Sequence, residues 1–466
     1  MVDLSIINGT VVTEDSIQSL DVHIADGRVV ALTAPGEVLN IESKEVLDAS
    51  GLHVLPGVVE PHAHIGLGGP DDWRTESASA ARGGVTTIFN YVMGSESHYD
   101  LVRKEHEHAE PNAHTDYALH IVPCTAQHLA ELDGYVNDLG VNSFKFFMSF
   151  RGDEGKYLGI AGSDDGHMFE YLSRVADHSG AVANIHAENI EVVWKLRAEA
   201  RAQGKEGLPA WNESRPDFVE AEALARAAFY GRVTNAPVYI VHTSAALTLE
   251  EAARARTARA VHGAPLYVET CAHYLTHTQD ATEGILAKVN PPLRTDADRE
   301  ALWAGLAAGA IQTVGSDHAP RHRSRKTGSI WESPAGVPGI GLQLTVLLSE
   351  GVHKRGLALT TVVAVVAANP AKIFGLYPQK GTIRTGSDAD ITLVDLGLER
   401  RVDADSFGGA AGYNLYEGWD MKGWPVATFL RGKYVLRDGE IVSSPGTGRY
   451  LRRSPLPYAQ SAPVKP

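Results

Sequence analysis

Four histidines and an aspartate in this chain stand where metal ligands could gather. His62 and His64 form a His-x-His pair at the end of an apolar run, and side chains two apart on a strand share one face. His186 and His242 end later apolar runs, and Asp317 follows another in Gly-Ser-Asp-His. Taken singly, such a histidine is more often a hydrogen-bonded structural residue, and Asp317 could cap a helix. Together they predict a metal site for Zn²⁺ first, with Mn²⁺, Co²⁺ or Fe²⁺ as alternatives.

A lysine inside an apolar strand adds to this set. Lys145 lies in Phe-Lys-Phe-Phe-Met, where an unpaired ammonium would be costly to bury. It could pair with a carboxylate, stay neutral as a Schiff-base nucleophile, or react with CO₂ to give a carbamate with two ligand oxygens. The carbamate fits best, because two divalent cations need more negative charge than one aspartate supplies.

Such a site predicts hydrolysis. Two metal ions close together can share a water molecule, lower its pKa towards neutrality and polarise a carbonyl. Asp317 would then be both a metal ligand and a proton shuttle. It would take a proton from the water molecule shared by the two ions and deliver it to the leaving nitrogen. The bond broken would be carbon–nitrogen, or a phosphoester if the pocket were basic.

The middle of the chain predicts the elements that would position these residues. Short apolar runs rich in β-branched residues alternate with helical patterns at 57–62, 85–90, 117–122, 141–147, 181–186, 237–242, 265–270 and 311–316. This alternation is typical of a (β/α)8 barrel, here over residues 56–370. A doubly wound open sheet is the alternative, but no Gly-x-Gly-x-x-Gly follows a first strand. Because the carboxyl ends of barrel strands meet on one face, all six candidates would converge there.

Both ends of the chain predict short strands with tight turns. Asn8-Gly9 and Asp26-Gly27 are hairpin turn signals, and residues 426–442 repeat the pattern. We expect one small β-sandwich domain formed by residues 1–55 and 371–445, followed by an extended tail over 446–466.

Composition and charge exclude several classes of protein. The net charge of −15 argues against nucleic acid and against anionic membrane surfaces as partners. No apolar stretch approaches the roughly 20 residues of a membrane span, and we expect no signal peptide. Two cysteines, Cys124 and Cys271, cannot form a disulfide framework, which fits a reducing compartment. We therefore expect a cytoplasmic protein.

The segments around these candidates resemble a known family. Residues 55–64 resemble the opening motif of the amidohydrolase superfamily, and further similar segments follow in order at 144–148, 186–189, 241–244, 269–275, 290–294, 315–320, 369–376 and 386–391. The chain is similar to the cyclic amidohydrolases, which are hydantoinases, dihydropyrimidinases, allantoinases and dihydroorotases. The resemblance implies a small cyclic amide substrate, a homotetramer and two divalent metal ions bridged by N6-carboxylated Lys145. It also implies one ion held by His62, His64 and Asp317, and a second held by His186 and His242.

The branch of this family is harder to assign. Dihydroorotases usually carry an arginine two residues after His-x-His, where this chain has Gly66. Residues 413–418 resemble hydantoinases and dihydropyrimidinases, which implies ring opening to an N-carbamoyl amino acid. An allantoinase, or another imide, lactam or amide hydrolase, is the alternative. Non-catalytic scaffold relatives lack the metal ligands, whereas all six are present here.

Three positions are expected to line the substrate pocket. Phe150 stands where related enzymes usually have a tyrosine whose hydroxyl supports the oxyanion, so this chain lacks that donor. In the family, a main-chain group before Pro-Pro holds the ring amide, and Asn290 occupies that position. A second main-chain contact usually comes from an asparagine, where this chain has Ala335 before Gly336-Val-Pro.

Overall fold

The computed structural model describes residues 1–37, 42–67, 69, 71–157, 164–259 and 263–453. Eight parallel strands form a barrel, in the spatial order β6 to β13. Each strand overlaps one of the eight apolar runs: β6 (Val58–Ala63), β7 (Val85–Val92), β8 (Asp116–Ile121), β9 (Ser143–Phe147), β10 (Val182–His186), β11 (Val238–Ile240), β12 (Leu266–Cys271) and β13 (Thr313–Gly315). The predicted barrel is therefore confirmed, and the open doubly wound sheet is excluded.

The barrel closes at the end where the candidate ligands lie. Ala63 and His318 form a parallel bridge between the ends of β6 and β13. The His64 amide donates to the His318 carbonyl at 2.8 Å. Closure of the barrel thus brings the His-x-His pair directly against the segment that carries Asp317.

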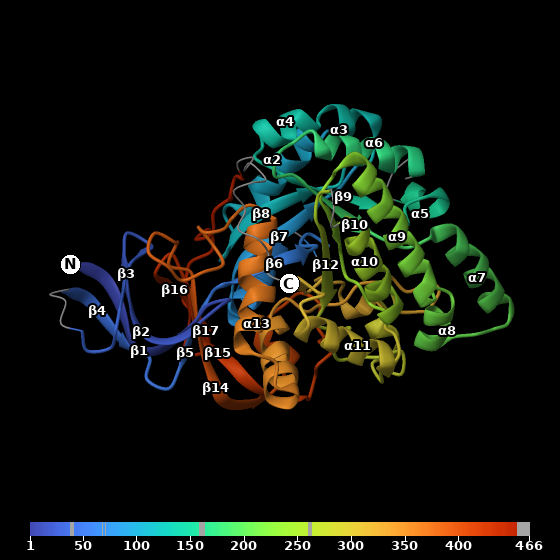
Figure 1. Ribbon diagram of the computed structural model, residues 1–466. Coiled ribbons are helices and arrows are strands. Elements are labelled where there is room, and N and C mark those ends of the chain that lie inside the picture. Colours follow the sequence, from blue (N-terminus) through green and yellow to red (C-terminus); the bar gives the residue numbers. More distant parts are fainter. Residues whose placement is uncertain (38–41, 68, 70, 158–163, 260–262, 454–466) are drawn as a thin grey trace.

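Helices surround the barrel (Figure 1). The longer ones are α1 (Asp72–Arg82), α2 (His98–Ala109), α6 (Asp165–Ala176), α7 (Ile190–Ala202), α9 (Asp217–Thr234), α10 (Ala246–Arg259) and α11 (Asp296–Ala307). The shorter ones are α3 (Ala126–Ala130), α4 (Leu132–Asn137), α5 (Gly152–Tyr157), α8 (Gly207–Glu213), α12 (Gln343–Val346), α13 (Leu359–Val363), α14 (Asn369–Ile373) and α15 (Ala404–Phe407). Leu347–His353 and Ala364–Ala368 are π-helical, and Gly284–Ala287 and Arg323–Arg325 are 3₁₀ turns. Among the described residues, no helix has both the length and the apolar character that a bilayer crossing requires.

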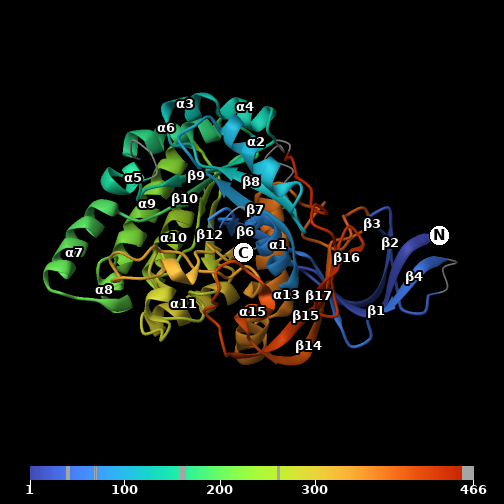
Figure 2. The ribbon, with the colours of Figure 1, turned by 180° about the vertical axis from the view of Figure 1, so that it is seen from behind.

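The two ends of the chain build a separate nine-stranded sheet, as expected. Its order is β17-β16-β15-β14-β5-β1-β2-β3, with β4 on β1, and Figure 2 shows its early and late strands side by side. The strands are β1 (Val2–Val12), β2 (Ile17–Ala25), β3 (Arg28–Thr33), β4 (Ser43–Asp48), β5 (His53–Pro56), β14 (Ile391–Arg401), β15 (Asp420–Leu430), β16 (Lys433–Arg437) and β17 (Glu440–Ile441). Ile6, Val22, Ile24, Ile391 and Phe429 belong to its own apolar core.

Buried charges join this sheet domain to the barrel. The Lys380 ammonium lies 2.7 Å from Asp116 on β8, 2.6 Å from Asp390 and 3.1 Å from Asp388, and all four side chains are buried. Asp390 directly precedes β14. One lysine therefore neutralises carboxylates from both domains.

The beginning of the expected tail packs on the barrel of its own chain. The Tyr117 amide on β8 donates to the Arg449 carbonyl at 2.9 Å, and the Leu451 amide donates to the Tyr117 carbonyl at 2.7 Å. The rest of the expected tail, residues 454–466, lies outside the described residues.

Candidate metal centre

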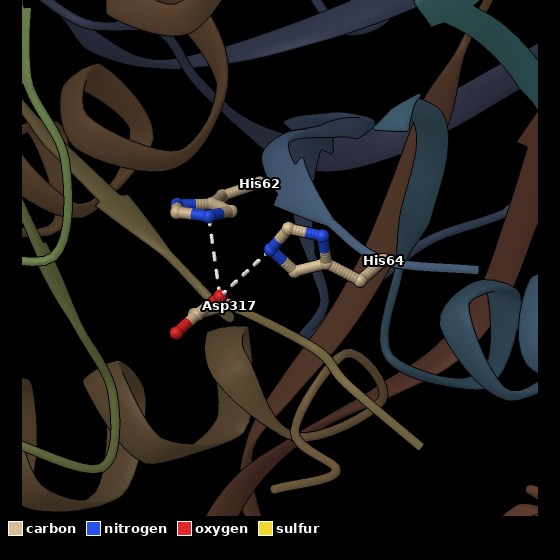
Figure 3. A group of neighbouring side chains, drawn as sticks. All are labelled: His62, His64 and Asp317. Atoms are coloured by element: carbon tan, nitrogen blue, oxygen red, sulfur yellow. Dashed lines mark ion pairs between the residues drawn. The ribbon is translucent and has the colours of Figure 1, made fainter. Parts of the chain in front are cut away.

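The ends of β6 and β13 bring three of the predicted ligands into contact (Figure 3). One carboxylate oxygen of Asp317, Oδ1, lies 3.1 Å from His62 Nε2 and 3.3 Å from His64 Nε2. Ligand atoms of these three residues all lie within 4.8 Å of one another. Asp317 holds a left-handed backbone conformation with φ of 45°, which is uncommon outside glycine and recurs at functional sites.

The other three predicted ligands lie around the same point. The rings of His186 and His242 are 4.6 Å apart, and the His242 ring is 5.4 Å from that of His62. The Lys145 Nζ lies 4.7 Å from the centre of the Tyr91 ring, and this ring is 4.9 Å from His62. All six residues predicted from the sequence therefore lie around one point, and all but His64 are buried.

Several buried polar atoms around this point lack a partner. Among the described residues, Lys145 Nζ and His242 Nδ1 have no hydrogen-bond partner. Within the described part of the chain His62 Nε2 also lacks a hydrogen-bond partner, although Asp317 Oδ1 lies 3.1 Å away. Leaving such atoms unsatisfied costs about 1–3 kcal/mol each, so buried groups of this kind call for a ligand. Imidazole nitrogens and a carboxylate fit a divalent metal ion.

The protonation states also fit metal binding. Burial lowers the pKa of His64 to about 4 and holds that of His242 well below its usual range. Burial also opposes the anionic form of Asp317, but His62 and His64 outweigh it and keep the pKa of that carboxyl below its ordinary value. Neutral imidazoles beside a carboxylate are the forms that bind metals at neutral pH.

Two glutamates orient the histidines, and neither was assigned a role from the sequence. Glu269 on β12 accepts from His62 Nδ1 at 2.7 Å, from the Tyr239 hydroxyl at 2.6 Å and from the His242 amide at 2.9 Å. Glu188 accepts from His186 Nε2 at 2.8 Å and pairs with Arg215 at 2.8 Å. Each bond leaves the other ring nitrogen for a metal, an arrangement common around metal-binding histidines. In the sequence, both glutamates stand near the carboxyl end of a predicted barrel strand, as the predicted ligands do, and this position could have indicated a role in the site.

A third acid, also missed, ties the two ligand-bearing strands together. Glu60 on β6 accepts from the His62 amide at 2.8 Å and from the Ser316 amide at 3.1 Å. Burial raises the pKa of Glu60 to about 8. Its contacts fix the backbone next to Asp317.

The three predicted substrate positions are less closely gathered. Phe150 stacks on Phe147 at 4.1 Å, and Phe147 in turn lies 4.9 Å from Lys145 Nζ, so Phe150 stands one ring back from the centre. Asn290 and Ala335 lie near each other, because the Gly336 amide donates to the Lys288 carbonyl at 3.0 Å. The Ala335 carbonyl already accepts from Arg321 Nε at 2.9 Å.

Known proteins similar to this chain agree with the fold and the centre. A sequence model described as Amidohydrolase family matches residues 170–435. A D-hydantoinase of Ralstonia pickettii is 35% identical, covering 97% of this chain and 99% of the relative, and an allantoinase of Deinococcus radiodurans is 36% identical, covering 97% and 98%. The crystal structure of dihydropyrimidinase from Brevibacillus agri superposes with a TM-score of 0.89 at 34% identity, covering 97% and 99%.

This chain belongs to the amidohydrolase family. The resemblance expected from its motifs is confirmed over nearly its full length. The metal dependence of that family agrees with the group formed by His62, His64 and Asp317.

Proposed function

We propose that this protein is a metal-dependent cyclic amidohydrolase that opens a hydantoin or dihydropyrimidine ring to an N-carbamoyl amino acid. The observation that carries the proposal is the convergence of Asp317 with His62 and His64 at 3.1 and 3.3 Å, at the closing edge of the barrel. Relatives named D-hydantoinase, similar over nearly the whole chain, support the ring chemistry.

Each residue of the centre takes one role in this proposal. His62, His64 and Asp317 would hold one ion, and His186 and His242 would hold the other. Zn²⁺ is the first candidate for both sites, with Mn²⁺, Co²⁺ or Fe²⁺ as alternatives. When bound, the ions lower the pKa of a water molecule and polarise the amide carbonyl. The Asp317 carboxylate accepts the proton from the attacking water and delivers it to the nitrogen as the carbon–nitrogen bond breaks.

In this proposal Lys145 would be N6-carboxylated and would serve as a ligand shared by the two ions. Burial lowers the pKa of Lys145 to about 7, so a substantial share of its amine is neutral and nucleophilic at neutral pH. The amine adds to CO₂ and releases one proton, which leaves a carbamate with one negative charge. That anion offsets the charge of the two cations in a space walled by Tyr91 and Phe147.

Substrate binding would rest on main-chain groups of Asn290 and Ala335, with Phe150 on the apolar side. Phe150 offers no hydrogen bond to the oxyanion, so its stabilisation falls to the metal ions. Allantoin ring opening is the second candidate, favoured by the Deinococcus relative named allantoinase.

Hydrolysis of a substrate panel by the metal-loaded protein tests this proposal. The panel contains hydantoin, both enantiomers of 5-substituted hydantoins, dihydrouracil, allantoin and a simple cyclic imide, each with a chelator-treated control. We expect chelator-sensitive opening of hydantoins or dihydrouracil. Turnover of allantoin alone would establish the second candidate. If the protein binds two metal ions but opens no ring, the proposed activity is wrong.

We further propose a cytoplasmic homotetramer divided as the sequence predicts, with a sheet domain of 1–55 and 371–445, a catalytic barrel of 56–370 and a tail from 446. Both cysteines are free and buried, which is compatible with a reducing compartment. Phe169 on α6 and Phe229 and Val233 on α9 are large apolar side chains about half exposed, as at a subunit contact. Light scattering after size-exclusion chromatography should give the mass of four chains. The mass of a single chain would contradict this assembly.

A further inference from the structure

Two buried lysines lie beside the predicted substrate-binding segments. Lys288 is 3% exposed and Lys326 is 4% exposed. Among the described residues, the hydrogen-bond partners of the two ammonium groups are main-chain carbonyl oxygens and not carboxylates. Burying an ammonium without an acid is costly, so a lysine kept in this environment calls for a reason beyond stability.

The Lys288 side chain binds one of these segments. Its Nζ donates to the carbonyls of Ile330 and Ser333, each at 2.5 Å. Ser333 is two residues before Ala335. The ammonium therefore fixes the backbone that leads into one predicted substrate contact.

The Lys288 main chain binds the same segment from the other side. Its carbonyl accepts from the Gly336 amide at 3.0 Å and from Lys326 Nζ at 3.0 Å. Lys288 is also two residues before Asn290, the other predicted contact. Three hydrogen bonds from one residue thus hold the stretch 330–336 against the stretch 288–290.

An indole ring connects Lys288 to the metal side of the pocket. Lys288 Nζ lies 4.0 Å from the centre of the Trp211 ring on α8, and the Arg215 guanidinium lies 4.8 Å from the same ring. The Trp211 Nε1 donates to the Val289 carbonyl at 3.0 Å. Arg215 pairs with Glu188, which orients His186. The two predicted substrate segments and the predicted ligand His186 are therefore connected through the contacts of Lys288, Trp211, Arg215 and Glu188.

We propose that Lys288 is a positioning residue, which sets the spacing between the main-chain groups of Asn290 and Ala335 that hold the substrate ring. This inference rests on the proposed function of those two residues. It requires that losing Lys288 weaken ring binding without emptying the metal site.

The Lys288→Met variant tests this, because methionine keeps an apolar stem against Trp211 and loses the three N–H donors. We expect KM for the ring substrate to rise about tenfold or more, with kcat changed by less than about threefold, as when binding shared by ground and transition states is lost. Metal content should stay that of the wild type. Lys372→Met removes a partly buried lysine of α14 that pairs with Glu14 at 3.0 Å and contacts neither predicted substrate segment, and it should leave KM unchanged.

Hydrogen exchange gives a readout that needs no substrate. The Gly336 amide should exchange faster in Lys288→Met than in the wild type and in Lys372→Met. If wild-type protein opens no ring, the proposed function fails, whereas the exchange comparison still decides the role of Lys288. Wild-type KM together with unchanged exchange in folded Lys288→Met would overturn the inference, as would loss of the metal ions. If Lys288→Met does not fold, Lys288→Gln replaces it, because the glutamine side chain is too short to reach both carbonyls. Its KM, metal content and Gly336 exchange are compared with those of the wild type in the same way.

Discussion

Lys145 is the residue whose chemistry sets this centre apart from an ordinary histidine cluster. It is fully buried, its Nζ has no hydrogen-bond partner among the described residues, and aromatic rings lie 4.7 and 4.9 Å away. In the centre that we propose, a charged ammonium in that place would repel the two metal ions. The proposal therefore requires a modified or neutral amine at Lys145.

Replacing Lys145 by alanine should therefore remove metal and activity together. Without the bridging anion, two cations would repel each other with little compensation, since charges interact strongly in a dry interior. We expect metal content, measured by inductively coupled plasma mass spectrometry, to fall well below that of the wild type, and turnover to vanish. Lys195→Ala, at an exposed lysine of α7, is the control. A Lys145→Ala protein with two ions and normal rates would rule out the bridging role.

Asp317→Asn tests the proton shuttle. The amide is nearly the same size but cannot accept the proton from the attacking water, so we expect kcat to fall by about 10²–10⁴. The melting temperature should change little. Asp296→Asn, at an exposed position of α11, should keep normal rates in the same assay. Near-normal turnover by Asp317→Asn would show that another group moves the proton.

At the level of secondary structure, the ends of the barrel strands position the candidate ligands. Buried glutamates hold these strand ends in place relative to one another. Glu269 on β12 binds the His62 ring from β6 and the amide of His242 just after β11, so one side chain sets the spacing of three strands. We expect Glu269→Gln to weaken metal binding by about 10–100-fold while the fold is kept. Competition with a coloured chelator measures this, with Glu250→Gln on the exposed face of α10 as control. Unchanged affinity would mean that the histidines orient themselves without Glu269.

The sequence predicts strands better than it predicts the contacts between them. All eight barrel strands and all six candidate ligands follow from local patterns, because strand period and strand-end position are properties of short segments. Position on a barrel strand could have marked Glu269 and Glu60, but their orienting roles depend on contacts with other strands, such as Glu269 with His62 and Glu60 with Ser316. The same holds for Tyr91, whose ring packs on His62. The pairing of Lys288 with Ile330 and Ser333 depends likewise on how two loops pack.

At the scale of the whole molecule, Lys380 joins the two domains. Asp116 comes from the barrel and Asp390 from the terminal sheet, and no local pattern relates these positions. Removing the shared cation would leave three buried carboxylates close together, with only Arg431 beside Asp116 and Arg28 beside Asp388 as remaining cations among the described residues. We expect Lys380→Met to lower the free energy of unfolding by about 3–5 kcal/mol. Lys422→Met, which breaks a surface pair with Glu399, should cost less than about 1 kcal/mol. Equal melting curves for the two variants would contradict this role of Lys380.

Titration of metal-free protein with Zn²⁺, followed by ring opening of the best panel substrate, tests whether this protein is a metal-dependent cyclic amidohydrolase. The protein is stripped by a chelator and reloaded in the presence of bicarbonate, and bound metal and rate are measured on the same samples. We expect the rate to rise until two ions are bound per chain and then to level off. Full activity in metal-free protein, or saturation of binding well below two ions per chain, would contradict it.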